Sequence, residues 1–404
     1  MKMVKCMKRA IVLSGGGAKG AYQIGVWKAL RKLKIDYSIV TGTSVGALNG
    51  AFMVQKDYYK AVNMWYHMSF SHVFEHMDGN YQTLEGKKNI LLTYAKGIMN
   101  GGMNISRLEK TLDKYLNVKR FYQSPIDFGL ITVNVSDLKP ESICKKDIKP
   151  NELKDYLLAS ASCFPAFPVK EIHGKKFVDG GYYDNIPIRL AIELGAEEII
   201  AVDLKSFGFK HPIKEKNIPI TYIEPYSDLG SFLVFDQSLA RRAMRLGFLD
   251  TMKKYGKLDG KVYAFRKGEL NVFYKKMNSF LEQLEDKYKK YINKQKEEKI
   301  IELIDFLGKC YSISDDKVYT YKSFHKALKK KFQKTKSIHL DEIRKQLRYD
   351  EPEKMNHMGM VLKYFCNEDS HREEFCKLFQ FVPITMIAAL YLEYTLNQHS
   401  NFWW

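Results

Sequence analysis

Two strand–turn–helix segments follow one another near the N-terminus, and they constrain the fold of this chain more than any other feature. A short apolar run at 10–14 (AIVLS) leads through a glycine-rich turn into an amphipathic helix at 21–33. A second strand at 37–44 (YSIVTGTS) leads into a helix of small residues at 45–54. Two more buried strands are predicted further along the chain, at 128–137 and 197–204. Strands that alternate with helices predict an α/β fold, with helices on both faces of the sheet.

The first glycine-rich turn fits the pattern of a dinucleotide-binding loop, but its surroundings do not. Gly15, Gly17 and Gly20 match G-x-G-x-x-G. Such a site needs an acidic residue about 20 positions later, at the end of the second strand. Here that strand ends without an acid, and Asp36 lies before it. A Walker-type phosphate loop is also a poor match, because Lys19 is followed by glycine and not by serine or threonine.

The second turn carries a candidate nucleophile. Residues 42–46 (GTSVG) match G-x-S-x-G between a predicted strand and a predicted helix, the setting in which this motif exposes a serine hydroxyl. A purely structural turn is the alternative interpretation. Turns that follow adjacent parallel strands lie at one edge of the sheet, so we expect the backbone N–H groups of the glycine loop beside the Ser44 hydroxyl. Such groups can stabilise an oxyanion.

A nucleophilic serine needs a base that accepts its proton, and an aspartate is the better candidate here. Among the ten histidines, His173 is the serious alternative, but His173 and Gly174 read as the turn of a hairpin. Asp179 ends the following strand and precedes two glycines. We therefore predict Asp179 as the base, with a partly desolvated carboxylate, because a solvated carboxylate is a weak base at neutral pH. Asp184 is interpreted as a turn former.

Four ordered motifs resemble the patatin-like phospholipase family over residues 8–205. They are GGGAKG, GTSVG, the alanine/serine–proline segment ASASCFPAFPV, and DGG. This resemblance implies a three-layer α/β/α fold and a Ser–Asp dyad that hydrolyses acyl esters of lipids, without a metal or another cofactor. It implies Ser44 as the nucleophile and Asp179 as the base. It also implies an oxyanion hole at Gly15, Gly16 and Gly17, with supporting residues Lys19, Gly20, Gly42, Gly46, Gly180 and Gly181.

The chain is predicted to have two parts. Residues 8–262 form the patatin-like catalytic domain, in which 66–103, rich in methionine and aromatic residues, is an irregular helical insertion and a lid candidate. A regular helix follows, where Ser106 and Glu109 predict a capping box. After this domain the alternation stops, and residues 263–404 form a basic, mainly helical region to which no role is assigned.

Charge and cysteine pattern bear on the partners and the location. A formal net charge of +19 favours anionic partners such as acidic lipid head groups. The six cysteines include no C-x-x-C pair, which argues against a zinc site and a disulfide framework and suits a reducing compartment. No apolar run reaches the roughly 18 residues of a membrane span. We therefore expect a cytoplasmic protein with peripheral contact to anionic membranes, through the basic helix at 321–336 or the terminal aromatic residues 402–404.

The sequence thus favours a lipid acyl hydrolase that cleaves fatty-acyl esters of phospholipids or lysophospholipids through a serine acyl-enzyme. A soluble carboxylesterase or thioesterase is the alternative from the same chemistry. A basic scaffold that binds membrane or nucleic acid without catalysis is the alternative from another class. The chain has a single basic helix and no recognised nucleic-acid-binding module, so no nucleic-acid partner is expected.

Overall fold

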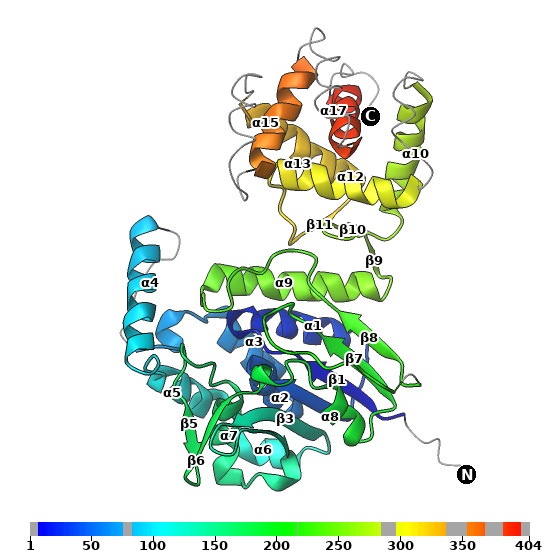
Figure 1. The fold of residues 1–404 in the computed structure, drawn as a ribbon. Coiled ribbons are helices and arrows are strands. Elements are labelled where there is room, and N and C mark those ends of the chain that lie inside the picture. The colour runs from blue at the N-terminus through cyan, green and yellow to red at the C-terminus, as the bar shows by residue number, and fades with distance from the viewer. Residues whose placement is uncertain are drawn as a thin grey trace, which may run out of the picture. The chain divides into compact units, whose positions relative to one another are not determined.

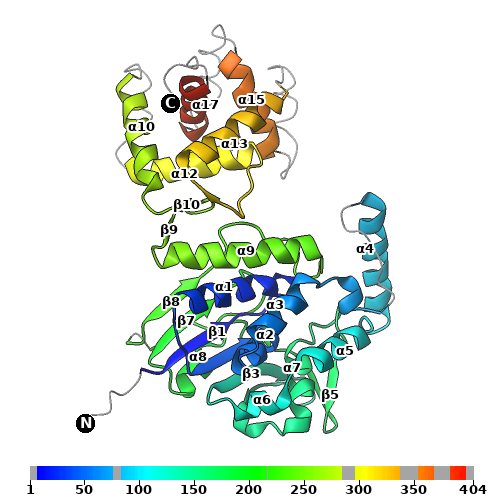
Figure 2. The same cartoon turned by 180° about the vertical axis from the view of Figure 1, so that it is seen from behind.

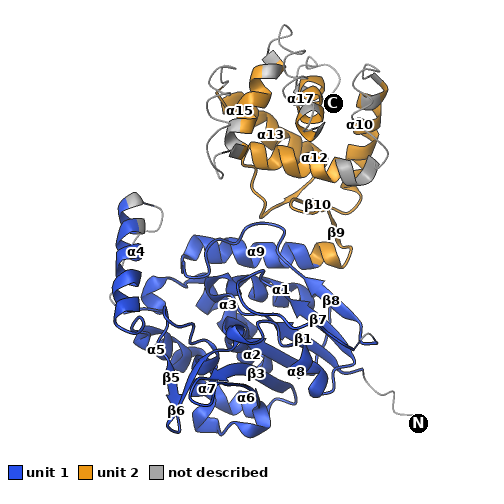
Figure 3. Ribbon diagram, viewed as in Figure 1, with its two compact units in different colours: residues 1–251 blue, residues 252–404 orange. Residues whose placement is uncertain are grey.

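The computed structural model describes residues 7–75, 83–215, 217–283, 296–336, 354–367 and 383–396 (Figure 1). The chain divides into two compact units, residues 1–251 and 252–404 (Figure 3). The predicted domain boundary, between residues 262 and 263, falls inside the second unit.

The first unit is built on an eight-stranded mixed sheet. The strands lie in the order β5-β6-β3-β2-β1-β7-β8, and β4 also pairs with β3. Pairing is parallel from β3 through β2, β1 and β7 to β8, and antiparallel where β4, β5 and β6 are involved. The four predicted strands are confirmed as β1, β2, β3 and β7. The strand bounds are β1 (Arg9–Leu13), β2 (Ile39–Thr43), β3 (Asp127–Asn134), β4 (Lys139–Cys144), β5 (Lys170–Ile172), β6 (Lys175–Asp179), β7 (Glu198–Val202) and β8 (Ile220–Ile223).

Helices cover both faces of this sheet, as the two opposite views show (Figures 1 and 2). The α-helices are α1 (Ala21–Lys32), α2 (Val45–Val54), α3 (Tyr58–Tyr66), α4 (Leu84–Met99), α5 (Ser106–Tyr115), α6 (Val118–Gln123), α7 (Leu153–Ser160), α8 (Ile188–Glu193) and α9 (Gln237–Lys254), the last of which ends in the second unit. The 3-10 turns are η1 (Gly17–Gly20), η2 (Phe70–His72), η3 (Lys145–Asp147), η4 (Pro150–Glu152) and η5 (Gly180–Tyr182).

Alternate residues of the central strands enter two separate apolar layers. In β1, Ala10 and Val12 pack with Ile188 and Ala191 of α8 on one face of the sheet. Helix α2 packs against β1, β2 and β3. Because both faces are covered, the central strands are continuous apolar runs and not alternating ones. The three-layer α/β/α arrangement predicted from the sequence is therefore confirmed.

The segment 66–103 is more regular than the sequence predicted. Its described part contains η2 and α4, and the Thr83 hydroxyl caps α4 by accepting the Gly86 N–H at 3.0 Å. Residues 76–82 lie outside the described residues. The capping box predicted at Ser106 is wrong, because Ser106 is the first residue of α5 and its hydroxyl donates to Glu75. The Asn104 side chain instead accepts the Ser106 N–H at 2.9 Å.

The second unit is mainly helical, as predicted. Its short strands are β9 (Leu258–Asp259), β10 (Ala264–Arg266) and β11 (Val318–Tyr319), and its helices are α10 (Glu269–Gln283), α12 (Lys296–Cys310), α13 (Tyr321–Lys334), α15 (Lys354–Asn367) and α17 (Pro383–Leu396). These elements surround an apolar core of their own. In the described parts of both units, no helix is long and apolar enough to cross a membrane.

The sequence led us to expect that helix α13 lies in a membrane interface with its apolar side in lipid, but the structure places that side in a protein core. Phe324, Leu328 and Phe332 are buried in the core of the second unit. The exposed side of the helix is instead basic, and it carries Lys322, Lys326, Lys329, Lys330, Lys331 and Lys334. The terminal aromatic residues 402–404 lie outside the described residues.

Candidate active site

The two turns singled out in the sequence lie side by side at the carboxyl ends of β1 and β2. These strands pair in parallel, with Leu13 opposite Gly42, so both chains turn at the same edge of the sheet. An added Cβ at Gly46 would lie 2.2 Å from the Leu13 carbonyl oxygen. Only a glycine at this position lets the start of α2 pack directly against the end of β1.

Ser44 occupies a strained turn between β2 and α2. Its backbone has φ 57° and ψ −128°, a conformation that L-residues rarely adopt. An added Cβ at Gly42 would lie 2.4 Å from the backbone of Gly46, so the two flanking glycines permit the sharp reversal. The predicted strand–turn–helix context of Ser44 is therefore present.

A second serine, which the sequence analysis missed, supports this turn. The Ser44 backbone N–H donates to the Ser160 hydroxyl at 2.9 Å, and that hydroxyl donates to the Ile131 carbonyl at 2.7 Å. Ser160 is fully buried at the end of α7, within the alanine/serine–proline segment. The segment was recognised in the sequence, but no local pattern distinguishes Ser160 from its serine neighbours. The Ser44 N–H is thereby occupied.

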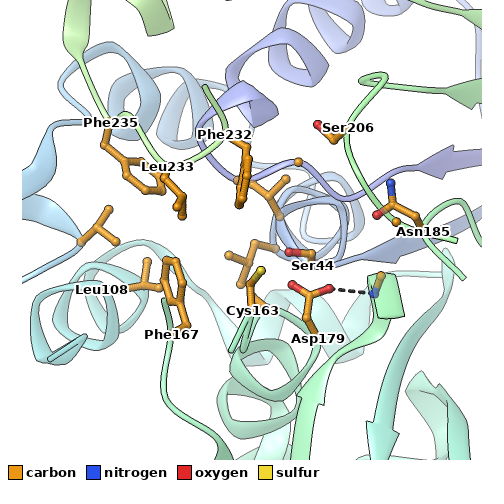
Figure 4. A pocket seen from close by; sticks show the side chains of 18 of the residues that line it. Ser44, Leu108, Cys163, Phe167, Asp179, Asn185, Ser206, Phe232, Leu233 and Phe235 are labelled. Carbon is orange, nitrogen blue, oxygen red and sulfur yellow. Dashed lines mark hydrogen bonds between the residues drawn. The ribbon is translucent and has the colours of Figure 1, made fainter. Parts of the chain in front are cut away.

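Asp179 ends β6 and faces Ser44 across the polar end of a pocket (Figure 4). Its carboxylate accepts the Gly181 N–H at 2.8 Å, and its side chain is 5 % exposed. Burial raises the pKa of Asp179 to about 6, while hydrogen bonds from the Ser44 side chain and the Gly181 N–H act in the opposite direction. The partial desolvation expected from the sequence is confirmed. An added Cβ at Gly180 would lie 2.2 Å from the Ile131 carbonyl oxygen, which accounts for this glycine.

The three amides predicted for an oxyanion hole are not equivalent in this structure. The Gly15 N–H donates to the Asn185 carbonyl at 3.0 Å and is occupied. In the described structure the N–H groups of Gly16 and Gly17 have no hydrogen-bond partner, and both residues line the pocket with Ser44. Gly17 has φ 52° and leaves no room for a side chain, since an added Cβ would lie 2.2 Å from the Phe232 carbonyl oxygen. Two of the three predicted donors are therefore available.

The two remaining residues of the loop have different surroundings. Gly20 packs closely on α2, because an added Cβ would lie 2.4 Å from a methyl group of Val45. The Asn49 amide also donates to the Gly20 carbonyl at 2.9 Å. The Lys19 side chain makes no hydrogen bond or ion pair within the described residues, so the structure suggests no role for it.

The structure separates Asp179 from the other candidates considered in the sequence. His173 and Gly174 form the turn between β5 and β6, with φ of 52° and 76°, as predicted. The His173 ring is exposed and contacts Glu152 at 3.1 Å. Asp184 is buried, but it does not line the pocket, and its carboxylate accepts the Ile186 N–H at 3.3 Å.

The pocket has an empty volume of roughly 1000 Å³, its open mouth included, and two chemically distinct sides (Figure 4). Ser44 lies between them. Its polar side is formed by Asp179, Asn185 and Ser206. Its apolar side is formed by Leu48, Met64, Trp65, Met68, Val73, Leu108, Leu112, Phe167, Leu233 and Phe235. Such a pocket fits a molecule with a long apolar chain joined to a polar group near Ser44. Within the described residues, no group of three or more histidine, cysteine, aspartate or glutamate side chains is placed to hold a metal ion.

Part of this chain is similar in sequence to known proteins. Residues 11–192 match the family model described as patatin-like phospholipase. Lysophospholipase nte1 of Aspergillus terreus is 29 % identical over 209 residues, which are 50 % of this chain and 12 % of that protein. Patatin-like phospholipase domain-containing protein 7 of Rattus norvegicus is 27 % identical over 199 residues, 49 % of this chain and 14 % of that protein. The chain therefore covers only about an eighth of the length of these relatives. The crystal structure of VipD from Legionella pneumophila aligns over 95 % of this chain and 90 % of that chain, with 13 % identity and a TM-score of 0.38.

Proposed function

The chain contains a patatin-like phospholipase domain, and from this premise we propose that it hydrolyses fatty-acyl esters of phospholipids or lysophospholipids. The observation that carries the proposal is the position of Ser44. Its hydroxyl lies on a strained turn, faces a buried carboxylate, and stands at the polar end of an apolar pocket. In this proposal Ser44 is the nucleophile and Asp179 is the base.

In the first half of the reaction, the Ser44 oxygen attacks the ester carbonyl while Asp179 accepts the hydroxyl proton. A carboxylate with a pKa of about 6 is ionised at neutral pH and is a stronger base than a solvated one. The free N–H groups of Gly16 and Gly17 are the proposed oxyanion donors, each worth about 3 kcal/mol of transition-state stabilisation in comparable sites. The tetrahedral intermediate collapses to an acyl-serine, and protonated Asp179 returns its proton to the departing alcohol.

In the second half, a water molecule attacks the acyl-serine. Asp179 accepts a proton from this water, and the same two N–H groups stabilise the second oxyanion. When the intermediate collapses, the fatty acid leaves and Asp179 returns the proton to the Ser44 oxygen. The site is then restored, and neither a metal nor a cofactor is required by this sequence of steps.

The apolar side of the pocket favours lipid esters over the alternatives. Ten apolar side chains line the pocket on one side of Ser44, and a short-chain carboxylesterase does not need such a large apolar surface. A scaffold without catalysis needs neither a serine in strained backbone geometry nor a desolvated aspartate beside it. We therefore rank both alternatives below the lipid hydrolase.

We also propose that the first unit meets a lipid surface through aromatic residues at the mouth of its pocket. Phe207 lines the pocket and its side chain is 84 % exposed, and nearby Phe209 is 63 % exposed. Tyr182 also lines the pocket and is partly exposed, and its hydroxyl donates to the Phe164 carbonyl. Exposed apolar residues beside a binding site mark a contact surface, and aromatic rings favour the interface of a bilayer. The proposed location is the cytoplasm, peripheral to anionic membranes.

The test is fatty-acid release from vesicles that contain anionic phospholipid and lysophospholipid. We expect Ser44→Ala and Asp179→Asn to lower the rate by about 10³-fold or more. Ser279→Ala and Asp36→Asn are matched controls, because both side chains are exposed and neither lines the pocket. They should retain the parent rate. A Ser44→Ala protein that releases fatty acid at the parent rate would contradict the proposal, and activity on short-chain esters alone would favour the esterase alternative.

A further inference from the structure

The amide of Asn185 is buried in the pocket wall without a partner for its donor. The residue is 2 % exposed, and its side-chain nitrogen Nδ2 makes no hydrogen bond. A buried donor without an acceptor destabilises the fold, because it loses its hydrogen bonds to water and gains none in return. Buried polar groups are almost always satisfied, so an exception that lines a substrate pocket points to a ligand that supplies the acceptor.

Asn185 is held in place on three sides, so its amide cannot turn away to find a partner. Its backbone N–H donates to the Phe209 carbonyl at 2.6 Å, and its carbonyl accepts the Gly15 N–H at 3.0 Å. Its side chain fits against three glycines. An added Cβ would lie within 3.1 Å of Asn185 side-chain atoms at Gly15, Gly181 or Gly208. The packing therefore fixes the amide, at the cost of leaving Nδ2 unpaired.

A second unpaired polar atom lines the same side of the pocket. The Ser206 hydroxyl oxygen is buried and has no hydrogen-bond partner. It lies close above the glycine loop, since an added Cβ at Gly16 would come within 2.7 Å of it. The segment after β6 and the segment after β7 thus each place one polar group in the same region of the pocket, and neither group has a hydrogen-bond partner.

The position of this pair relative to Ser44 indicates which part of an ester it meets. Leu108, Phe167 and Phe235 lie on one side of the serine, and Asn185 and Ser206 lie on the other (Figure 4). An ester with its carbonyl carbon at Ser44 and its acyl chain on the apolar side directs its alcohol portion to the polar side. We propose that Asn185 and Ser206 bind an oxygen of this alcohol portion, so that the site selects glycerolipid esters. This inference rests on the proposed function.

Both groups are positioning residues in this proposal. Asn185 donates through Nδ2 and Ser206 through its hydroxyl to oxygens of the glycerol backbone or of the phosphate attached to it. An ester whose alcohol portion offers no such oxygen, such as an aryl ester, gains nothing from them. We expect each group to contribute about tenfold to the discrimination, because a ligand that leaves the buried polar groups of a site unpaired binds less well.

Binding tests the proposal without turnover. In a Ser44→Ala background, a monomeric short-chain lysophosphatidylcholine is compared with the free fatty acid of the same chain length by titration calorimetry. We expect Asn185→Ala and Ser206→Ala each to weaken lysophosphatidylcholine binding by about tenfold, which is about 1.4 kcal/mol, and to leave fatty-acid binding unchanged. Leu108→Ala on the apolar side should weaken both ligands. Asn89→Ala, at an exposed position outside the pocket, should weaken neither.

Activity with Ser44 present gives the second readout. The ratio of kcat/KM for lysophosphatidylcholine to kcat/KM for an aryl ester with the same acyl chain should fall about tenfold in each variant. An equal loss on both substrates would place the two groups at the ester carbonyl and overturn the proposal, as would unchanged lysophosphatidylcholine binding. Selective binding without hydrolysis by the parent would remove the proposed function but leave this subsite in place.

Discussion

At the scale of single residues, the buried carboxylate of Asp179 predicts a conflict between activity and stability. Its pKa is raised to about 6 by burial, from 3.8 in the unfolded chain. The unfolded chain therefore ionises at a lower pH than the folded one, and folding stability falls as the pH rises from 4 to 6. Above pH 6 the ionised group lowers the free energy of unfolding by about 3 kcal/mol, since one pKa unit corresponds to about 1.4 kcal/mol.

Asp179→Asn should therefore be less active but more stable than the parent at pH 8. At pH 3, which is below both pKa values, the parent carboxylate is largely protonated in both states, and the two proteins should have similar stability. Urea unfolding at the two pH values measures the difference, with Asp36→Asn as the exposed control. A variant that is equally stabilised at both pH values would show that repacking, and not ionisation, is responsible.

The same group predicts the pH dependence of the reaction. The base must be ionised, so kcat/KM on a monomeric ester should rise with pH through about 6 and then level off. With a solvated carboxylate of ordinary pKa, the rise would be complete by about pH 5. A pH–rate profile with a monomeric ester separates these cases, and the use of monomers keeps vesicle binding out of the measurement.

The positions of residues in a local motif could be predicted from the sequence, and the positions of residues brought together from distant segments could not. Ser44 and Asp179 stand in G-x-S-x-G and DGG, whose geometry is set within a few positions. Ser160 accepts the Ser44 N–H, and Asn185 packs against three glycines, and in both cases the fold brings the partners together from separate segments of the chain. The sequence predicted Gly15 as an oxyanion donor. It could not show that the Gly15 N–H already donates to the carbonyl of Asn185, which lies far away in the chain.

At the scale of elements, the contact between α1 and α9 depends on glycines at close backbone approach. An added Cβ at Gly25 would lie 2.0 Å from the Met244 carbonyl oxygen, and one at Gly247 would lie 2.0 Å from the Tyr22 carbonyl oxygen. Neither obstacle is the end of a flexible side chain, so the helices themselves must separate to admit a methyl group.

We expect Gly25→Ala to lower the free energy of unfolding by about 1–3 kcal/mol, as other overpacking substitutions do. Gly97→Ala on α4 is the matched control. The atom nearest to its added Cβ would be the side-chain sulfur of Met103, which can change rotamer, and alanine favours a helix over glycine by about 1 kcal/mol. Chemical denaturation of both variants tests this, and a Gly25→Ala protein as stable as Gly97→Ala would contradict it.

The amphipathic patterns in the sequence correctly predicted helices, but they did not predict what the apolar face of each helix packs against. The stripe of Phe324, Leu328 and Phe332 fits a membrane interface and a protein core equally well in sequence, and the structure buries it in the second unit. Helix caps show the same limit. Ser106 and Glu109 have the spacing of a capping box, yet Glu75 and Asn104 in the preceding segment take up the Ser106 groups.

At the scale of the whole molecule, the net charge of +19 and the exposed aromatic residues make different predictions for membrane contact. Charge attracts the protein to anionic lipid over a distance of about 10 Å and is screened by salt. Aromatic insertion acts only at contact and is insensitive to salt. Binding to anionic vesicles should therefore weaken as salt is added, and the binding that remains should depend on the aromatic residues at the pocket mouth.

The variants Phe207→Ser and Phe209→Ser test whether aromatic residues at the pocket mouth contribute to vesicle binding. Both side chains are exposed, so their replacement removes little folding energy, but it removes apolar surface beside the pocket. We expect each variant to bind vesicles at high salt several-fold more weakly than the parent and to hydrolyse vesicle lipid correspondingly more slowly. The rate on a monomeric ester should be unchanged after Phe209→Ser, because Phe209, unlike Phe207, does not line the pocket. Tyr59→Ser is the control, because Tyr59 is 75 % exposed in the same unit and does not line the pocket. If all three variants bind vesicles as the parent does, charge alone holds the protein at the membrane, and the mouth of the pocket is not the surface that meets lipid.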